Sequence, residues 1–169
     1  VKTQESVKFT VSLTDRTGKN VYCRATSVGG GDDWTRLEVE LTPQAADSDA
    51  DLRICWENAG YVCVGAVSLL PKDHFHGMRR DVVAAMKDLG IKVLRWPGGN
   101  FAGEFNWMDG LLPADMRAPF QSYLGLETQP HTMGYDFSEM NTDDFIALCR
   151  EIGAEPFITI NPCWNTPDE

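Results

Sequence analysis

The sequence lacks any apolar run of the roughly 20 residues that a helix needs to cross a bilayer, and no charged-apolar-small signal segment opens it. Basic residues are also scarce, because 15 Lys and Arg stand against 25 Asp and Glu, for a formal net charge of −10. Such an acidic chain with no basic run would repel a nucleic-acid backbone. We expect a soluble protein that binds neither membrane nor nucleic acid, with its compartment, secreted, periplasmic or cytoplasmic, left open.

The common metal and phosphate motifs are missing too. The five cysteines form no C-x-x-C spacing, no G-x-G-x-x-G or G-x-x-x-x-G-K loop occurs, and His74 and His76 have no third ligand at a suitable spacing. We therefore expect no cofactor and no metal. Free thiols are the simplest interpretation of the cysteines, and the alternative is a disulfide between Cys55 and Cys63 across a hairpin that turns at residues 58–60.

The first half of the chain, from Val7 to about Leu69, has the pattern of short strands. Strand-like runs occupy residues 7–11, 37–41, 52–56 and 61–64, and glycine, aspartate and asparagine separate them. Between residues 37 and 41 apolar and charged side chains alternate strictly, as a strand with one buried face requires. This half is typical of the later strands of a β-sandwich.

After Pro71 the apolar period becomes helical. The expected elements are a helix over 81–89, a strand over 91–96, a helix capped by Asn141 or Thr142, and a strand over 156–160. Gly90 and Gly153 stand where a left-handed residue would end each helix. Two successive helix-glycine-strand units predict parallel strands joined by helices.

A long connection separates these two units. Residues 97–140 contain four prolines and no clear periodic segment, whereas a strand-to-helix loop usually has about 2–6 residues. Loops that follow the strands of a (β/α)8 barrel form its binding face, and a doubly wound open sheet also binds ligands at its strand ends. The connection therefore predicts a binding site under either architecture.

Amides and aromatic rings gather around the two strand ends. Asn100 follows the turn at residues 97–99, Asn161 follows the second strand, and the rings are Trp96, Phe101, Phe105, Trp107, Phe120, Tyr123 and Tyr135. Sugars bind by stacking on such rings while polar side chains contact their hydroxyls. The alternative is that these rings only pack the long loop against the rest of the barrel and contact no sugar. The nearby carboxylates cannot be paired by sequence, so none is assigned as a catalyst.

Several motifs occur in the order in which one known family carries them. They are Arg95-Trp96-Pro97-Gly98-Gly99-Asn100-Phe101, Asn106-Trp107-Met108-Asp109-Gly110, Glu127-Thr128, Asp143-Asp144-Phe145 and Cys149-Arg150-Glu151-Ile152-Gly153-Ala154-Glu155-Pro156. From about Gly77 onwards the chain resembles the first part of the barrel of the family 51 α-L-arabinofuranosidases. Residues 34–39 and 67–71 resemble the sandwich that some members insert near the start of that barrel.

The resemblance implies an α/β fold with two parts. Residues 1–71 would be the C-terminal part of an antiparallel β-sandwich similar to a carbohydrate-binding module, and residues 72–169 the early units of an incomplete (β/α)8 TIM barrel. It also implies a retaining glycoside hydrolase that removes arabinofuranosyl residues from arabinoxylan and arabinan. Both catalytic glutamates of the family lie on later strands, so we expect no catalytic residue in this chain and a need for the remaining segments of the same hydrolase.

The residues carried over by the resemblance are those that bind substrate. Asn100 resembles the family asparagine that hydrogen-bonds the arabinose hydroxyls, and Tyr123 stands near the place of a loop tryptophan. Trp96, Trp107 and Asn161 complete the candidate set, although Trp107 resembles a structural residue of the loop more than a ligand residue. This chain departs from the family at residues 162–164, where a glycine-rich turn is usual, and in an insertion over 129–140. Both would reshape the mouth of the site.

Two other interpretations stay open at this point. A hydrolase of the same class could act on xylosides or β-glucans, and a carbohydrate-binding protein could hold a glycan with Trp34 and the loop aromatics without cleaving it. The expected partner is a carbohydrate in each case. The sequence leaves open whether the protein forms a homo-oligomer.

Overall fold

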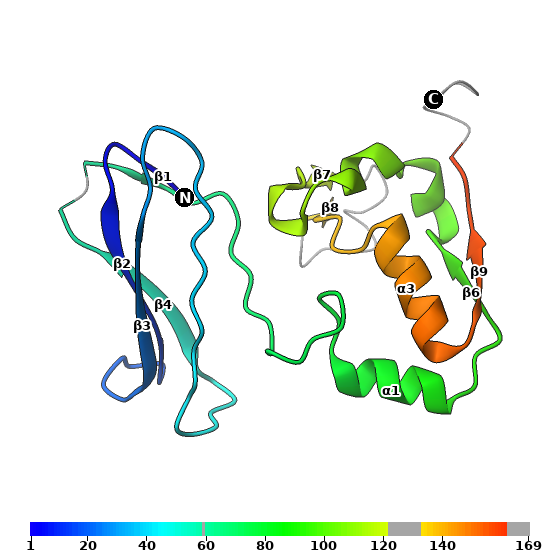
Figure 1. Cartoon of the computed structure of the whole chain (residues 1–169), viewed down its shortest axis with the longest axis horizontal. Coiled ribbons are helices and arrows are strands. Elements are labelled where there is room, and N and C mark those ends of the chain that lie inside the picture. Colours follow the sequence, from blue (N-terminus) through cyan, green and yellow to red (C-terminus); the bar gives the residue numbers. More distant parts are fainter. Residues whose placement is uncertain (59, 122–132, 162–169) are drawn as a thin grey trace. The chain divides into compact units, whose positions relative to one another are not determined.

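The computed structural model describes residues 1–58, 60–121 and 133–161 and divides into two compact units, Val1–Val67 and Ser68–Glu169. Figure 1 shows that strands dominate the first unit and that helices and strands alternate in the second. The expected mixed α/β class is confirmed at this level. None of the described helices is long and apolar enough to cross a bilayer.

The first unit is built around strand β2. In its larger sheet β2 (Val7–Thr14) lies between β3 (Val21–Gly29) and β4 (Asp51–Trp56), and all pairs are antiparallel. A second, antiparallel pair joins β1 (Lys2–Thr3) to β5 (Val62–Cys63). Val7 and Phe9 are buried, as alternate apolar residues on one face of a strand should be.

In this unit one predicted strand does not form and one strand was not predicted. Residues 37–41 form no strand, although Leu37, Val39 and Leu41 are half-buried and the charged residues between them are exposed. The alternation therefore fixed which side of the chain is covered, but it carries no information about a pairing partner. Strand β3 was missed, because its many polar residues hide the period.

The hairpin hypothesis for Cys55 and Cys63 was also wrong. Strand β4 pairs with β2, whereas β5 pairs with β1, so the two cysteines lie in different sheets. Both are free thiols. A short turn between two runs indicates a hairpin only when the runs pair with each other, and here each run pairs with an earlier strand.

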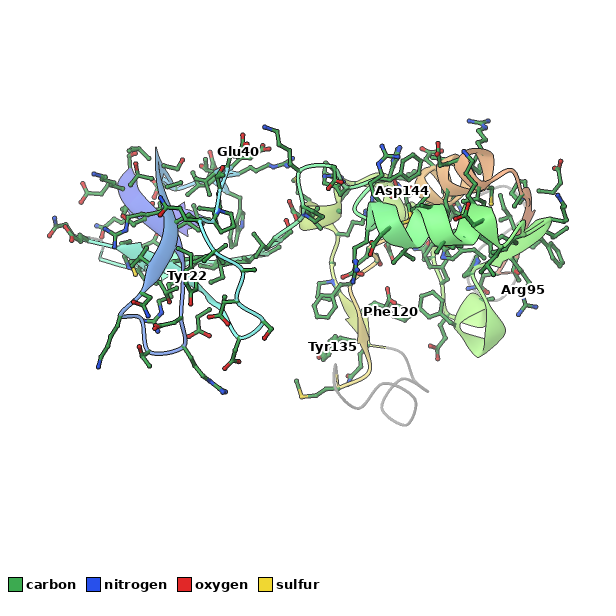
Figure 2. All side chains as sticks on the ribbon, turned by 90° about the horizontal axis from the view of Figure 1, so that it is seen from below. Tyr22, Glu40, Arg95, Phe120, Tyr135 and Asp144 are labelled. Carbon is green, nitrogen blue, oxygen red and sulfur yellow. The ribbon has the colours of Figure 1, made fainter. Side chains whose placement is uncertain are left out.

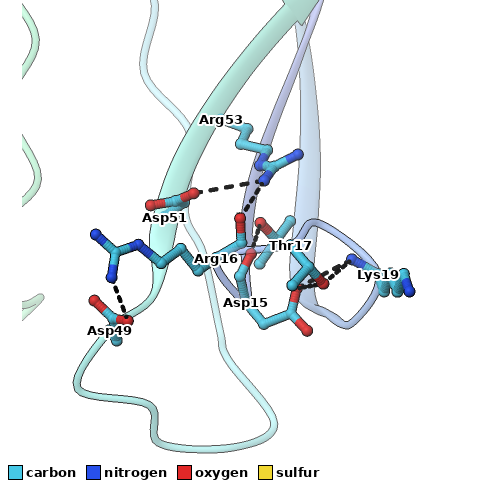
Figure 3. A network of polar contacts seen from close by, with 8 residues as sticks. Asp15, Arg16, Thr17, Lys19, Asp49, Asp51 and Arg53 are labelled. Carbon is cyan, nitrogen blue, oxygen red and sulfur yellow. Dashed lines mark hydrogen bonds and ion pairs between the residues drawn. The ribbon is translucent and has the colours of Figure 1, made fainter.

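Polar contacts hold the turn between β2 and β3 (Figure 3). The Asp15 carboxylate accepts hydrogen bonds from Thr17 Oγ1 at 2.9 Å, the Lys19 backbone at 3.0 Å and Asn20 Nδ2 at 2.8 Å. Desolvation acts to raise the pKa of Asp15, but these bonds outweigh it and lower that pKa. Nearby, a hydrogen bond to Asp47 raises the pKa of Tyr22 to about 12. These contacts are exposed, and their role is to stabilise the turn.

The second unit confirms the predicted helix and strand order. Helix α1 (Arg80–Asp88) leads to β6 (Val93–Trp96), and α3 (Thr142–Ile152) leads to β9 (Glu155–Ile158). Strands β6 and β9 pair in parallel, with Val93 opposite Glu155. A core of Val83, Leu148, Ile152 and Ala154 joins the two helices, and Leu94 packs against it.

The helix-end predictions were confirmed as well. The Asn141 side chain accepts from the Asp144 backbone at 2.7 Å, while the Asp144 carboxylate accepts from the Asn141 backbone at 3.3 Å, which makes a capping box. Gly153 ends α3 in the left-handed conformation, at a φ of 75°. Sequence left Asn141 and Thr142 open as caps, and the structure selects Asn141.

The described residues of the long connection form only short elements. They are η1 (Gly99–Gly103), η2 (Trp107–Leu111), η3 (Ala114–Met116), β7 (Phe120–Gln121) and β8 (Tyr135–Asp136). Strands β7 and β8 pair antiparallel, so the described parts of the connection fold back on themselves before α3 begins. The prediction of no long periodic segment holds over these residues.

Replacing Gly153 tests how strongly the chain depends on this helix end. A Cβ at this position would meet nothing within 4 Å, so the cost of Gly153→Ala is that of the left-handed backbone alone, about 1–2 kcal/mol. Asparagine tolerates that conformation better, and Gly153→Asn should lose less. Urea unfolding followed by circular dichroism at 222 nm measures both. Equal stability of the three proteins would contradict the assignment.

Candidate functional site

The candidate site lies where β6 and β9 end side by side (Figure 1). The Thr159 backbone N–H donates to the Trp96 carbonyl at 2.9 Å. This hydrogen bond extends the contact between the two strands one residue beyond the end of β9. The chain then leaves β6 through a cis Trp96–Pro97 bond and through Gly99, whose φ is 60°. Residues 99–103 and 160–161 therefore follow adjacent strand ends.

A chain of aromatic rings runs from this edge into the long connection. Trp96 meets Phe105 edge to face at 4.7 Å and stacks on Phe145 at 5.6 Å. Phe101 in turn lies 5.8 Å from both Phe105 and Phe120. Phe105 and Phe145 are buried, and Trp96 is half-buried. These rings hold the connection against the strand end, whatever else they contact.

Asn161 reaches the same cluster from the other strand. Its Nδ2 donates to the Phe105 carbonyl at 3.1 Å, so the end of β9 is tied to the connection that leaves β6. Asn100 lies in η1, directly after Gly99, which places its backbone at the strand edge. The structure describes no more than this of Asn100, and Tyr123 and Cys163 lie outside the described residues.

Trp107 is placed differently from Trp96. It opens η2, and the residue as a whole is 44% exposed. Asn106 caps this short helix, because its Oδ1 accepts from the Met108 backbone at 3.2 Å. Trp107 is thus an accessible ring on a fixed turn. The roles of all five candidate residues in substrate binding stay predictions.

A buried arginine that sequence reasoning missed secures the rest of the connection. The Arg117 side chain is only 5% exposed. It donates to the Leu112 carbonyl at 2.8 Å and to the Ser138 carbonyl at 2.6 Å, and it lies 3.7 Å from Asp144 Oδ2. One guanidinium thus joins both sides of the connection to the start of α3. No local pattern in the sequence indicates this role, because the partners of Arg117 stand up to 27 positions away.

Several of these contacts meet at Asp144, which lies in the first turn of α3 and is labelled in Figure 2. Besides capping the helix and facing Arg117, it lies 3.0 Å from His76 Nδ1. His76 is therefore engaged with a carboxylate. Among the described residues no group of three His, Cys, Asp or Glu side chains could hold a metal ion.

Cys149 is a free thiol on α3, the helix that precedes β9. It is buried on α3, and burial, with the charge of Glu155, raises its pKa. A raised pKa keeps the thiol protonated and unreactive at neutral pH. Cys149 is one of the free thiols that the sequence led us to expect.

Comparison with known proteins gives a consistent result. Residues 85–168 match the family described as Alpha-L-arabinofuranosidase 1 domain. Alpha-L-arabinofuranosidase C of Emericella nidulans is 37% identical over 101 residues, which make up 59% of this chain and 18% of that protein. The intracellular exo-alpha-L-arabinofuranosidase of Bacteroides ovatus is 37% identical over 111 residues, or 65% and 20% of the two chains. The chain thus spans about a fifth of these relatives.

Solved structures give the same family. The α-L-arabinofuranosidase of Thermotoga maritima, in an arabinose complex, is 37% identical and matches with a TM-score of 0.50 over 60% of this chain and 20% of that one. The arabinose-bound MgGH51 α-L-arabinofuranosidase matches with a TM-score of 0.66 over 94% of this chain and 26% of that one, at 17% identity. The second match shows likeness of fold alone, and it includes residues of both units.

Removing the buried guanidinium tests its structural role. Arg117→Met would leave two backbone carbonyls and Asp144 without their donor, at an expected cost of about 2–3 kcal/mol in the free energy of unfolding. Arg117→Lys keeps the charge but not the fork of donors, and it should recover only part of the loss.

The matched control is Arg150→Met, since Arg150 is an exposed arginine on α3 whose loss should change stability by less than about 0.5 kcal/mol. Urea unfolding followed by circular dichroism compares the variants. If Arg117→Met were as stable as Arg150→Met, Arg117 would not hold the connection.

Proposed function

Because residues 85–168 belong to the family 51 α-L-arabinofuranosidases, we propose that this chain is part of a hydrolase that removes α-L-arabinofuranosyl residues from arabinoxylan and arabinan. The family match confirms the resemblance that the motifs from Arg95 to Pro156 indicate. It is also the single observation that carries the proposal. The activity and substrates belong to the whole protein, of which this chain would supply about a fifth.

The two units correspond in this proposal to two parts of such an enzyme. Residues 72–169 form the early units of a (β/α)8 barrel, supported by the parallel pair β6 and β9, the helix between them and the long connection at their C-terminal edge. Residues 1–71 form part of an antiparallel β-sandwich similar to a carbohydrate-binding module, supported by the two antiparallel sheets. The fold likeness to MgGH51 agrees with both assignments.

The reaction we propose is hydrolysis with retention of configuration. One carboxyl protonates the glycosidic oxygen while a carboxylate about 5–5.5 Å away attacks the anomeric carbon, and water then hydrolyses the glycosyl-enzyme. We place both carboxyls outside this chain. Its own contribution is the part of the site that recognises the sugar, because binding contacts that strengthen in the transition state lower the barrier.

Each candidate residue has a place in this arrangement. Asn100 and Asn161 follow adjacent strand ends, where their amides can donate to and accept from sugar hydroxyls. Trp96 forms the packed base of the site, and Trp107 offers an exposed ring on the connection. Tyr123 would extend this aromatic wall. No described contact favours a xyloside, a β-glucan or a purely binding function over the arabinofuranoside.

Activity assays test the proposal directly. Hydrolysis of a chromogenic α-L-arabinofuranoside is expected from the longer protein that includes the later strands and not from residues 1–169 alone, since the carboxyls would be absent. A chromogenic β-xyloside and a β-glucoside serve as controls for the sugar. Hydrolysis by the 169-residue chain itself would overturn the placement of the carboxyls, and inactivity of both proteins would overturn the proposed substrate.

The role of Asn100 can be measured in the longer protein. Asn100→Ala should lower kcat/KM for the arabinofuranoside by about 10- to 100-fold, the effect of one lost hydrogen bond in a dry site. Asn20→Ala is the control, because Asn20 lies in the turn between β2 and β3. Unchanged kcat and KM for Asn100→Ala would remove this residue from the site.

A further inference from the structure

We propose that Trp34, backed by Gly65, is a stacking site for a polysaccharide chain on the first unit. The inference rests on the proposed function for the class of ligand, and on the geometry of the first unit for the site itself. It concerns binding of the polymer, which is a separate event from recognition of the sugar that is cleaved.

The Trp34 ring lies with one face against the backbone of Gly65. A Cβ added to Gly65 would be 3.1, 3.4 and 3.7 Å from three consecutive atoms of the six-membered ring. A point beyond the edge of the ring would be close to one atom and clearly farther from its neighbours, so these similar distances place Gly65 over the face. A side chain at this position would make the contact tighter than usual, and the ring would have to shift by a few tenths of an ångström even for a Cβ.

The Trp34 residue as a whole is 60% exposed, so the contact with Gly65 leaves much of it accessible to solvent. Trp56 in the same unit is less exposed, at 44%, and its ring lies 6.4 Å from that of the buried Phe9. Trp34 thus combines a contact on one face with a large exposed area. A flat apolar surface of this kind suits the C–H face of a sugar.

Backbone hydrogen bonds fix the segment that carries Trp34. Its neighbour Thr35 exchanges two hydrogen bonds with Val1, at 2.6 and 2.8 Å, and β1 pairs with β5 through Lys2 and Cys63. The segment that carries Trp34 thus contacts the chain at β1, β1 pairs with β5, and Gly65 stands two residues after β5. A fixed backbone limits the conformational entropy that the ring would lose on binding.

Polar side chains near Trp34 suit a carbohydrate. Asp32, Asp33 and Arg36 are exposed and stand within two positions of Trp34 in the chain, and Lys2 lies on β1, next to the segment that carries Trp34. These side chains offer both donors and acceptors for hydroxyl groups.

Affinity electrophoresis of the 169-residue chain in gels that contain soluble arabinoxylan tests the site. The wild-type chain should be retarded, and Trp34→Ala should weaken the apparent affinity by at least about tenfold. Trp34→Tyr should retain part of the affinity because it keeps a ring. Gly65→Val should lose affinity although Trp34 is intact, since the new side chain would displace the ring.

The control is Val28→Ala, which removes an exposed apolar side chain, 66% exposed, from β3 of the same unit. It should migrate like the wild type, and circular dichroism should show that all variants are folded. Equal retardation of Trp34→Ala and wild type, or a wild-type chain that is not retarded, would overturn the inference.

The longer protein separates this inference from the proposed function. Trp34→Ala should leave kcat/KM for a small chromogenic arabinofuranoside unchanged and raise KM for arabinoxylan. A protein that is retarded by the polymer but hydrolyses no arabinofuranoside would refute the proposed function and keep the stacking site. An active protein whose retardation does not depend on Trp34 would refute the stacking site and keep the proposed function.

Discussion

The parallel pairing of β6 with β9 is the constraint on which the second unit depends. Parallel neighbours must be joined by a crossover, and here that crossover contains both α3 and the whole connection from Pro97 to Met140. Because both strands end at the same edge, the connection has to start where the chain after β9 also emerges. The contact from Asn161 to the Phe105 carbonyl is a direct result of that geometry.

A connection this long needs its own restraints, and the structure supplies two kinds. Aromatic rings hold its first part against Trp96, while Arg117 and Asn141 hold its later part through backbone carbonyls. Asn141 both caps α3 and donates to the Gly110 carbonyl at 3.0 Å, so formation of the helix and placement of the connection are coupled. Loss of either restraint would loosen the edge that carries the candidate site.

The success of the sequence predictions follows the range of the interactions behind them. Helix caps, left-handed glycines and apolar periods depend on neighbours within a few residues, and α1, α3 and the parallel strands were predicted for that reason. The pairing of β4 and β5 depends on earlier strands, and the Cys55–Cys63 hairpin failed accordingly. Arg117 contacts residues up to 27 positions away, and no local pattern indicates such a group.

The burial of the tryptophans suggests how recognition would be divided. A residue that holds the reacting sugar benefits from a dry, packed setting, since hydrogen bonds there discriminate strongly, and Trp96 is half-buried between Phe105 and Phe145. A residue that holds the polymer would have to accept many stretches of chain and release them, which favours an accessible ring, and Trp34 is 60% exposed. In our proposals the same side chain would therefore serve two tasks, and the supporting neighbours, rings at Trp96 and a glycine at Trp34, would distinguish them.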